Sequence, residues 1–239
     1  QDIGCRSFTY ISTMGLAMEA AAENGIEFIV LDRPNPLGGN RVEGNLVEDG
    51  FISFVSQFKI PYLYGLTCGE LAVMLNEENM LGKKVKLHVV KMEGWKRSMT
   101  FDKTGLQWVP SSPHIPQPIS AIAYPISGIL GELGYISIGV GYTIPFQMFA
   151  AEWINAEALA ERLNSYKLPG VHFRPIHVKP FYAVGVGKNL QGVQVHVMNY
   201  EKAALTEIQF YVMQALAELH PEQAVFKNAS DKRFRMFDQ

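Results

Sequence analysis

Residues 26–39 read Ile-Glu-Phe-Ile-Val-Leu-Asp-Arg-Pro-Asn-Pro-Leu-Gly-Gly and decide how the first half of the chain folds. The apolar run at 26–31 is typical of a strand that is buried on both faces of a parallel sheet. It is followed by Asp32, Arg33 and Asn35 on a backbone restricted by two prolines. Because ligands of open α/β sheets bind beyond the carboxyl ends of the strands, this loop predicts a binding site. The alternative is that Asp32 and Arg33 pair with each other or cap a neighbouring element.

The residues around this strand predict a repeated helix and strand pattern. Residues 9–24 have helical spacing of apolar side chains, and residues 68–79 form a second helix opened by a capping box of Thr67 and Glu70. Residues 84–90 then alternate and become apolar, which predicts a second strand. The long stretch between the first strand and Tyr64 is irregular, but its aromatic residues favour packing over disorder. We therefore expect an α/β fold whose N-terminal domain is a Rossmann-like layer, incomplete in this chain.

A proline-rich segment near residues 108–118 predicts a domain boundary. We expect a Rossmann-like domain over residues 1–108 and a smaller α+β domain over residues 109–239. The second domain should contain helices at 155–165 and 203–219 and strands at 171–178 and 192–198.

The composition excludes several classes of protein. The 239 residues carry a net charge of −2 with no basic stripe, so a nucleic-acid partner is not expected. No apolar run of about 18 residues exists, so the chain is not expected to span a membrane. The six histidines are dispersed and the two cysteines are too few for a metal cluster, so no metal site is expected. Cys5 and Cys68 are predicted to be buried thiols, with a disulfide between them as the alternative.

What remains is a set of carboxylates and aromatic side chains. The glycines at 139 and 141 lack the third glycine of a dinucleotide fingerprint, so no cofactor is expected. Two carboxyl groups that flank a glycosidic bond can hydrolyse it, and aromatic rings can form platforms for a sugar. The candidate carboxylates are Asp2, Asp32, Glu43, Glu70 and Glu132, and the candidate platforms are Tyr10, Tyr64, Trp95 and Trp108. These residues are compatible with a glycosidase or with a non-catalytic binding domain.

Several ordered motifs resemble a bacterial family of exo-β-N-acetylmuramidases, formerly described as a domain of unknown function. The strongest agreements are Gln1-Asp2-Ile3-Gly4 with Arg6, residues 9–13, residues 31–36 with Val42-Glu43-Gly44, residues 65–72, and Met92-Glu93-Gly94-Trp95 with Arg97. Weaker agreement continues through residues 108–113, 137–139, 145–146 and 168–173. The resemblance therefore covers nearly the whole chain.

This resemblance implies a cleft between the two domains and release of N-acetylmuramic acid from the non-reducing ends of peptidoglycan fragments, or muropeptides. It also implies a role in cell wall recycling and a periplasmic or otherwise extracytoplasmic location. Under this hypothesis the catalytic candidates are Asp32 and Glu132. Glu132 is interpreted either as a buried carboxyl whose raised pKa lets it protonate the leaving oxygen or as a solvated acid in a loop. The substrate-binding candidates are Asp2, Arg6, Tyr10, Arg33, Asn35 and Glu43.

The chain departs from the family pattern in two places. The family's Glu-His-Gly motif, which carries a favoured catalytic glutamate, would lie upstream of residue 1. Val140 stands where the family often has an arginine, so the lactyl carboxylate of muramic acid is expected to be held elsewhere or the substrate to differ. Arg6 and Arg33 are the candidate substitutes.

Two other functions remain open from the sequence. One is a non-catalytic muropeptide- or glycan-binding protein, which would bind without turnover. The other is a nucleotide-dependent enzyme, which the missing glycine fingerprint disfavours. The first residue is not Met and residues 232–237 form a basic and aromatic run close to the end, so we expect a fragment of a longer protein.

Overall fold

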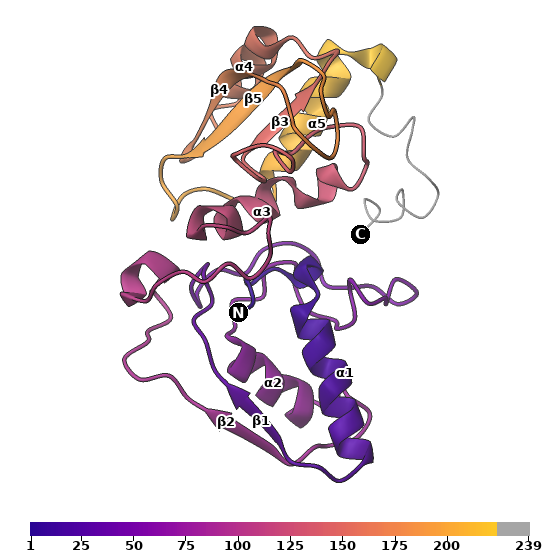
Figure 1. The fold of residues 1–239 in the computed structure, drawn as a ribbon, viewed down its shortest axis with the longest axis vertical. Coiled ribbons are helices and arrows are strands. Elements are labelled where there is room, and N and C mark those ends of the chain that lie inside the picture. Colours follow the sequence, from indigo (N-terminus) through magenta and orange to yellow (C-terminus); the bar gives the residue numbers. More distant parts are fainter. Residues whose placement is uncertain (224–239) are drawn as a thin grey trace. The chain divides into compact units, whose positions relative to one another are not determined.

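The computed structural model describes residues 1–223, and the basic and aromatic run at 232–237 lies outside them. The described chain forms two compact units. Unit 1 comprises residues 1–111 and 116–121, and unit 2 comprises residues 112–115 and the chain from 122 onward. Figure 1 colours the elements of each unit along the sequence. Both units mix helices with small sheets, so the expected α/β class is confirmed at that level.

Unit 1 follows the helix and strand order that the sequence predicts. Its elements are η1 (Arg6–Phe8), α1 (Tyr10–Glu23), β1 (Phe28–Leu31), α2 (Cys68–Glu77), β2 (Leu87–Val90) and η2 (Phe101–Thr104). β1 and β2 pair in parallel, from Phe28 opposite Leu87 to Leu31 opposite Val90. The carboxyl ends of both strands therefore lie at the same edge of the sheet.

The core of unit 1 lies on one face of this sheet. Ile11 and Met18 of α1 pack with Leu71 and Leu75 of α2 and with Val30 of β1. The irregular chain after β1 also contributes, since Phe58, Tyr62 and Tyr64 are buried. The expected packing of that long loop is confirmed at these rings.

The expectation that the first strand is buried on both faces is wrong for the described chain. Val30 is only 8% exposed, whereas Ile29 is 55% and Leu31 is 72% exposed. Successive side chains of a strand point to opposite faces, and only the face of Val30 meets the helices. The apolar run in the sequence therefore does not indicate whether one face or both faces of this strand are buried within residues 1–223.

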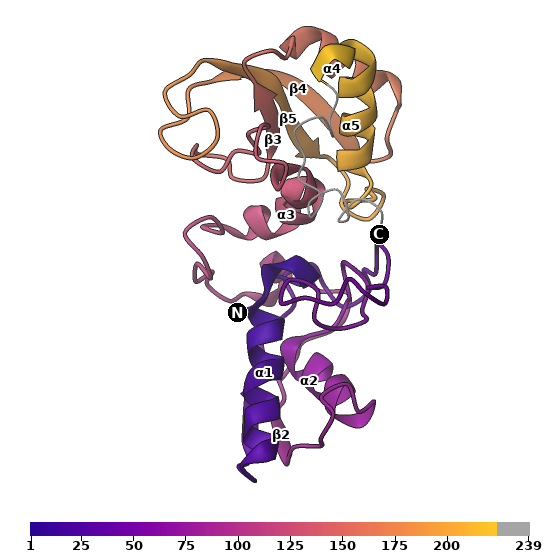
Figure 2. The same ribbon diagram turned by 90° about the vertical axis from the view of Figure 1, so that its right-hand side faces the viewer.

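Unit 2 is a three-stranded antiparallel sheet with helices packed on it. Its elements are α3 (Pro118–Gly131, whose first turn belongs to unit 1), β3 (Met148–Ala151), α4 (Ala156–Ser165), β4 (Val171–Val178), β5 (Leu190–Val197), α5 (Ile208–Leu219) and η3 (Pro221–Gln223). The strand order is β3-β5-β4, and both pairings are antiparallel. Figure 2 shows α4 and α5 on the same side of this sheet, in agreement with their contacts.

Most predicted elements of the second half are present, and two were missed. β4 has the predicted bounds, and α4 begins one residue later than predicted, because Asn155 is its N-cap and accepts from the Ala158 amide at 2.9 Å. The histidines at 172, 177 and 196 lie on β4 and β5, as expected. The predicted helix at 203–219 begins only at Ile208. The missed elements are β3 and α3; α3 begins at Pro118, the last residue of the proline-rich segment, and contains Pro125, which disfavours a helix in the sequence.

A buried glutamine of α5 inserts into the backbone hydrogen bonds of α3 after Pro125. Gln209 of α5 is fully buried, and its Nε2 donates to the Pro125 carbonyl at 3.1 Å. Its Oε1 accepts from the amides of Ile129 and Leu130, both at 3.1 Å. The amide side chain thereby satisfies backbone groups that an uninterrupted helix would pair internally.

Candidate functional site

Asp32 joins the carboxyl end of β1 to the start of α2. Its Oδ1 accepts from the backbone amides of Gly69 at 2.8 Å and Arg33 at 2.9 Å, and its Oδ2 accepts from the Thr67 hydroxyl at 2.8 Å. A carboxylate at the N-terminus of a helix satisfies amides that lack intrahelical partners. The structure therefore confirms that Asp32 caps a neighbouring element, which was one of the two interpretations of this loop.

The predicted capping box at α2 is also present. The Thr67 hydroxyl accepts from the Glu70 amide at 3.2 Å, and the Glu70 carboxylate accepts from the Thr67 amide at 3.0 Å. The other Glu70 oxygen accepts from Arg97 at 2.8 Å, and Arg97 also donates to the carbonyls of Gly39 and Gly65. Arg97 thus links the first turn of α2 by hydrogen bonds to the loops that contain Gly39 and Gly65.

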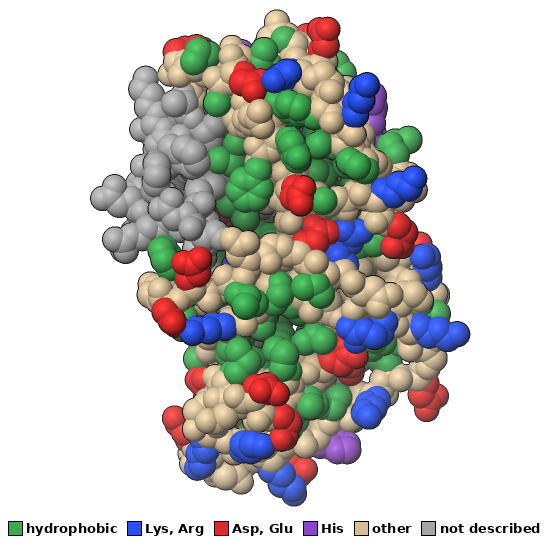
Figure 3. Space-filling view, turned by 180° about the vertical axis from the view of Figure 1, so that it is seen from behind, with side chains coloured by type: hydrophobic (Ala, Val, Ile, Leu, Met, Phe, Trp, Pro, Cys, Tyr) green, Lys and Arg blue, Asp and Glu red, His purple; other side chains and the backbone are tan. Residues whose placement is uncertain are grey.

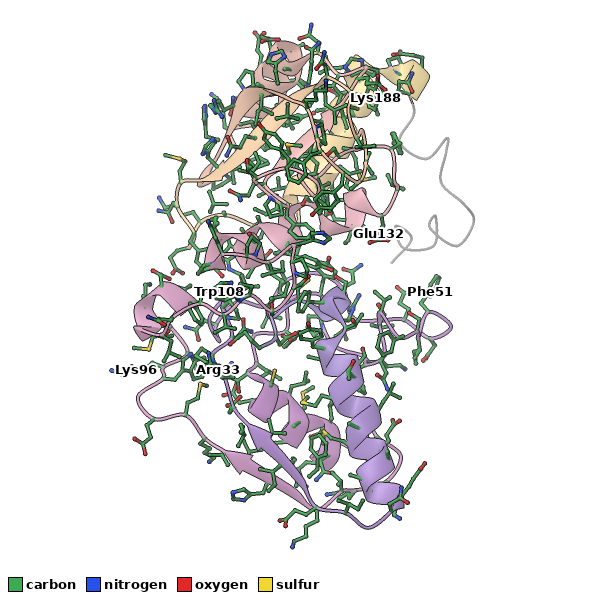
Figure 4. The ribbon with its side chains drawn as sticks, in the orientation of Figure 1. Arg33, Phe51, Lys96, Trp108, Glu132 and Lys188 are labelled. Carbon is green, nitrogen blue, oxygen red and sulfur yellow. The ribbon has the colours of Figure 1, made fainter. Side chains whose placement is uncertain are left out.

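A cavity of about 260 Å³ opens at this edge of the sheet. It is lined by Asp32, Glu70, Val89, Lys91 and Trp95, among others. The Trp95 indole nitrogen is buried and has no hydrogen-bond partner within residues 1–223. Figure 4 places Arg33 just past the end of β1, at the end of unit 1 that also carries Lys96. An aromatic ring with carboxylates and a cation nearby suits a sugar-type ligand.

Asp2 is a buried carboxyl with one oxygen left without a partner. Its Oδ2 accepts from the Gly4 amide at 2.7 Å and from the Tyr64 hydroxyl, whereas its buried Oδ1 has no partner within residues 1–223. Burial raises the pKa of Asp2, and the hydrogen bonds from Tyr64 and Gly4 oppose this shift. A carboxyl whose proton is retained by burial is suited to act as an acid.

The raised pKa of Asp2 predicts a definite pH dependence of stability. The folded state binds the Asp2 proton more tightly than the unfolded state does. The stabilisation that results from this difference is fully present below the unfolded pKa of about 3.8. It is lost as the pH rises from there through the folded pKa. Urea unfolding at increasing pH should show the free energy of unfolding of the wild type falling relative to that of Asp2→Asn. Asp49→Asn, at an exposed carboxylate paired with Lys59, is the control, and parallel pH curves for wild type and Asp2→Asn would contradict the prediction.

The carboxylates of Asp2 and Asp32 both raise the pKa of the thiol of Cys68, the first residue of α2. Burial raises the pKa of the Cys68 thiol to about 12, and the negative charges of Asp2 and Asp32 contribute to the shift. Cys5 is buried as well, and burial raises its thiol pKa to about 12. Both cysteines are free thiols, so the disulfide alternative is not realised.

Arg6 and Asn35 hold the loops around Asp2. One Arg6 nitrogen donates to the carbonyls of Asn45 at 2.8 Å and Ile60 at 2.5 Å, and the side chain is buried. The buried Asn35 accepts from the Leu37 amide at 2.9 Å and donates to the Leu66 carbonyl at 3.0 Å. These contacts give both side chains a structural role.

The remaining candidates in unit 1 are closer to solvent. Arg33 is half-buried, and its Nε donates to the Gln1 side chain at 3.2 Å. Tyr10 is 46% exposed and donates to the Ser111 carbonyl. Glu43 pairs with Arg41, and its backbone pairs with that of Leu63. Of these, Arg33 lies nearest in sequence to the cavity residue Asp32.

Of the two interpretations of Glu132, the structure bears out the solvated acid and contradicts the buried carboxyl. Glu132 is exposed in the turn directly after α3, where it is labelled in Figure 4. The helix ends at Gly131 and the chain turns outward, so the side chain meets solvent. Together with Val140 it lines a second cavity, which belongs to unit 2.

The surface charges are of both signs. On the face drawn in Figure 3, Lys and Arg side chains alternate with Asp and Glu over both units. Within residues 1–223, no helix is long and apolar enough to cross a membrane. In the same residues, no group of three histidine, cysteine, aspartate or glutamate side chains is placed to hold a metal ion.

Comparison with known proteins decides the family. Residues 1–119 match the family model described as exo-β-N-acetylmuramidase NamZ, N-terminal, and residues 122–239 match the model for its C-terminal part. The chain belongs to the exo-β-N-acetylmuramidase NamZ family. It is 44% identical to the peptidoglycan β-N-acetylmuramidase NamZ of Bacillus subtilis (strain 168) over 226 residues, which is 95% of this chain and 54% of that protein.

Two solved structures share the fold of this chain. A DUF1343 family protein of Bacteroides fragilis is 72% identical, with a TM-score of 0.96, and the match covers all of this chain and 62% of that one. A second DUF1343 family protein of the same species is 24% identical, with a TM-score of 0.74 over all of this chain and 65% of that one, and shows the shared fold. The chain thus spans between half and two thirds of the length of these relatives.

Sequence reasoning missed Lys91 and Ser137, which line the two cavities, and Gln209, which bonds to the backbone of α3. Lys91 reaches the first cavity because it follows β2 directly, a position that the strand prediction could have indicated. Ser137 lines the second cavity and Gln209 bridges α3, but neither carries a sequence signal because each depends on a contact distant in the chain.

Proposed function

We propose that the whole protein is a glycoside hydrolase that releases N-acetylmuramic acid from the non-reducing ends of peptidoglycan fragments. The observation that carries this proposal is the 44% identity to a peptidoglycan β-N-acetylmuramidase over 95% of the chain, with both family domains matched in order. The reaction breaks the bond from the sugar C1 to the leaving oxygen, adds the oxygen of water to C1 and transfers a proton to the leaving group.

The structure supports specific roles for the residues of unit 1. Asp2 is our candidate for the acid that protonates the leaving oxygen, because burial raises its pKa and Oδ1 has no partner within residues 1–223. Asp32 is a positioning residue, since two of its hydrogen bonds hold the loop to the start of α2 and the third fixes the turn at Arg33. We assign a second reacting carboxyl to the glutamate that the family resemblance places upstream of residue 1.

Substrate binding is proposed at the edge of the sheet. Trp95 offers an aromatic platform in the cavity beside Asp32, and Lys91 offers a cation. Arg33 is our candidate for the lactyl carboxylate of muramic acid, because its guanidinium is half-buried whereas that of Arg6 is buried against two carbonyls. The parallel β1 and β2 with α2 between them support a Rossmann-like layer in unit 1.

A recycling role outside the cytoplasmic membrane, in the periplasm, follows from the substrate, because peptidoglycan lies there. Fractionation of cells that make the whole protein tests this placement. Recovery of the protein only with cytoplasmic markers would contradict it.

The test of the function is release of free N-acetylmuramic acid by the complete protein. The substrates are a muramyl-glucosamine disaccharide and intact peptidoglycan, with products separated by chromatography and mass. We expect one N-acetylmuramic acid per disaccharide, with release from intact peptidoglycan confined to chain ends. Binding of the disaccharide without turnover by the folded protein would instead indicate a glycan-binding protein.

A further inference from the structure

The sheet of unit 2 has one face under α4 and α5 and a second face that is covered only in part by the described residues. One half of the second face, around Val178 and Leu190, packs with Tyr142 and Ile144. The other half belongs to the start of β4 and the end of β5. It carries polar side chains that we call the polar patch: His172, Arg174, Gln194 and His196. The two residues of β4 are exposed and the two of β5 are half-buried, so the patch is open to a ligand.

The strand pairing brings these side chains together. His172 lies directly opposite His196, and Arg174 lies directly opposite Gln194. Residues opposite each other on antiparallel strands share a face, with Cβ atoms about 4.5–5.5 Å apart. Arg174 donates to the Gln194 side-chain oxygen at 2.7 Å, so its guanidinium is held across the strand pair. The polar patch is therefore a compact group of hydrogen-bond donors on two paired strands.

The polar patch has no negative charge of its own. The other side chains on this face of the three strands are all uncharged: Met148, Ala150, Ile176, Val178, Leu190 and Gly192. Arg174 forms no ion pair with a carboxylate within residues 1–223. On the opposite face of β4, His177 has such a partner in Glu157, at 3.4 Å. A ligand would supply the negative charge that the polar patch lacks.

The pKa of His196 reflects this unbalanced charge. Burial lowers the pKa of His196, and the Arg174 guanidinium and the His172 ring lower it further. β3 adds only uncharged side chains to this face, and the loop packed on its other half adds Tyr142. None of these neighbours within residues 1–223 carries a negative charge at neutral pH. A bound anion would therefore raise the pKa of both histidines.

The arrangement of the donors favours a phosphate group over a carboxylate. Two imidazole rings and one guanidinium can contact three separate oxygens, and a phosphate group offers three acceptor oxygens. Its charge near pH 7 is about −1.5 to −2, because its second pKa is about 6. A carboxylate offers two oxygens and a single charge, so it would leave at least one of the three groups without an anionic partner.

We propose that the polar patch binds a phosphate group, either as inorganic phosphate or as a small phosphate monoester. Arg174 makes charge-assisted hydrogen bonds to the phosphate oxygens, and the rings of His172 and His196 each donate an N–H to a further oxygen. The site includes none of the residues assigned above to hydrolysis or to sugar binding. The inference therefore goes beyond the proposed function and does not depend on it.

The test is NMR of the histidine ring signals in the complete protein, at an ionic strength kept constant with sodium chloride. The signals of His172 and His196 are assigned by their loss in His172→Gln and His196→Gln. Inorganic phosphate should shift both signals saturably, with half of the change at about 1–10 mM, and should raise both pKa values. The ring of His177 is the internal reference and should not respond, because it lies on the opposite face of β4.

Arg174→Gln should weaken phosphate binding about ten-fold or more, because it removes the charged donor of the patch. Tm should be unchanged, since glutamine can still donate to Gln194. The matched control is Arg162→Gln, at an arginine of α4 that pairs with Glu218, and it should leave phosphate binding unchanged.

The remaining arms identify the ligand and can overturn the proposal. Glycerol 3-phosphate serves as the monoester, and a stronger response to it than to inorganic phosphate would indicate an organic phosphate as the ligand; the reverse would indicate free phosphate. Equal responses to acetate and phosphate would overturn the preference for a phosphate group. Shifts that do not saturate, or equal losses of affinity in Arg174→Gln and Arg162→Gln, would overturn the site.

Discussion

Asp2→Asn in the complete protein is expected to lower kcat for muramyl-glucosamine hydrolysis by about 100-fold or more. General acid catalysis typically contributes about 10²–10⁴-fold, and asparagine cannot donate a carboxyl proton. The fold should survive, because the amide oxygen of asparagine can still accept from the Gly4 amide and the Tyr64 hydroxyl. Steady-state release of N-acetylmuramic acid, with Tm measured on the same samples, checks both statements.

Asp32→Asn is expected to affect stability more and kcat less than Asp2→Asn does. Asp32 accepts two hydrogen bonds that hold the loop to the start of α2, from the Thr67 hydroxyl and the Gly69 amide, and a third from the adjacent Arg33 amide. Loss of the charge should destabilise the protein by about 1–3 kcal/mol and reduce kcat less than Asp2→Asn does. If Asp32→Asn abolished turnover at unchanged stability while Asp2→Asn kept it within a few-fold, the two roles would have to be exchanged.

Gln209→Leu is expected to destabilise unit 2 by about 3–5 kcal/mol. Leucine has a similar size but leaves the amides of Ile129 and Leu130 and the Pro125 carbonyl without the partner that Gln209 provides. Each buried polar group without a partner costs about 1–3 kcal/mol, partly relieved by relaxation of α3. Urea unfolding should show a lower midpoint, and hydrogen exchange should lose protection at residues 129 and 130.

The matched control is Gln214→Leu on the same helix. Gln214 is exposed and donates to Glu218, so its loss should change stability by less than about 0.5 kcal/mol. Equal destabilisation by the two variants would mean that the glutamine bridge contributes no more than an exposed helical position.

The sequence alone determined the features that depend on nearby residues. The capping box of Thr67 and Glu70, the helix near 155–165 and the bounds of β4 are set by contacts within a few residues or by side-chain periodicity. The ordered motifs also identified the family, because many short matches in a fixed order are specific. These signals were sufficient to predict the α/β class and to select the candidate site residues. They did not determine which role each of these residues has.

Only the tertiary structure decided the roles, because each depends on groups far apart in the chain. Asp32 caps a helix that begins 36 positions later, and Asp2 is buried against Tyr64, 62 positions away. Gln209 hydrogen-bonds backbone groups of α3, including the Pro125 carbonyl 84 positions before it. Burial and hydrogen-bond satisfaction are properties of the packed environment, and a residue's own sequence neighbourhood does not contain them. The sequence therefore identifies the acidic and amide side chains. The packing of the tertiary structure determines which of them stabilise the fold and which can contact a ligand.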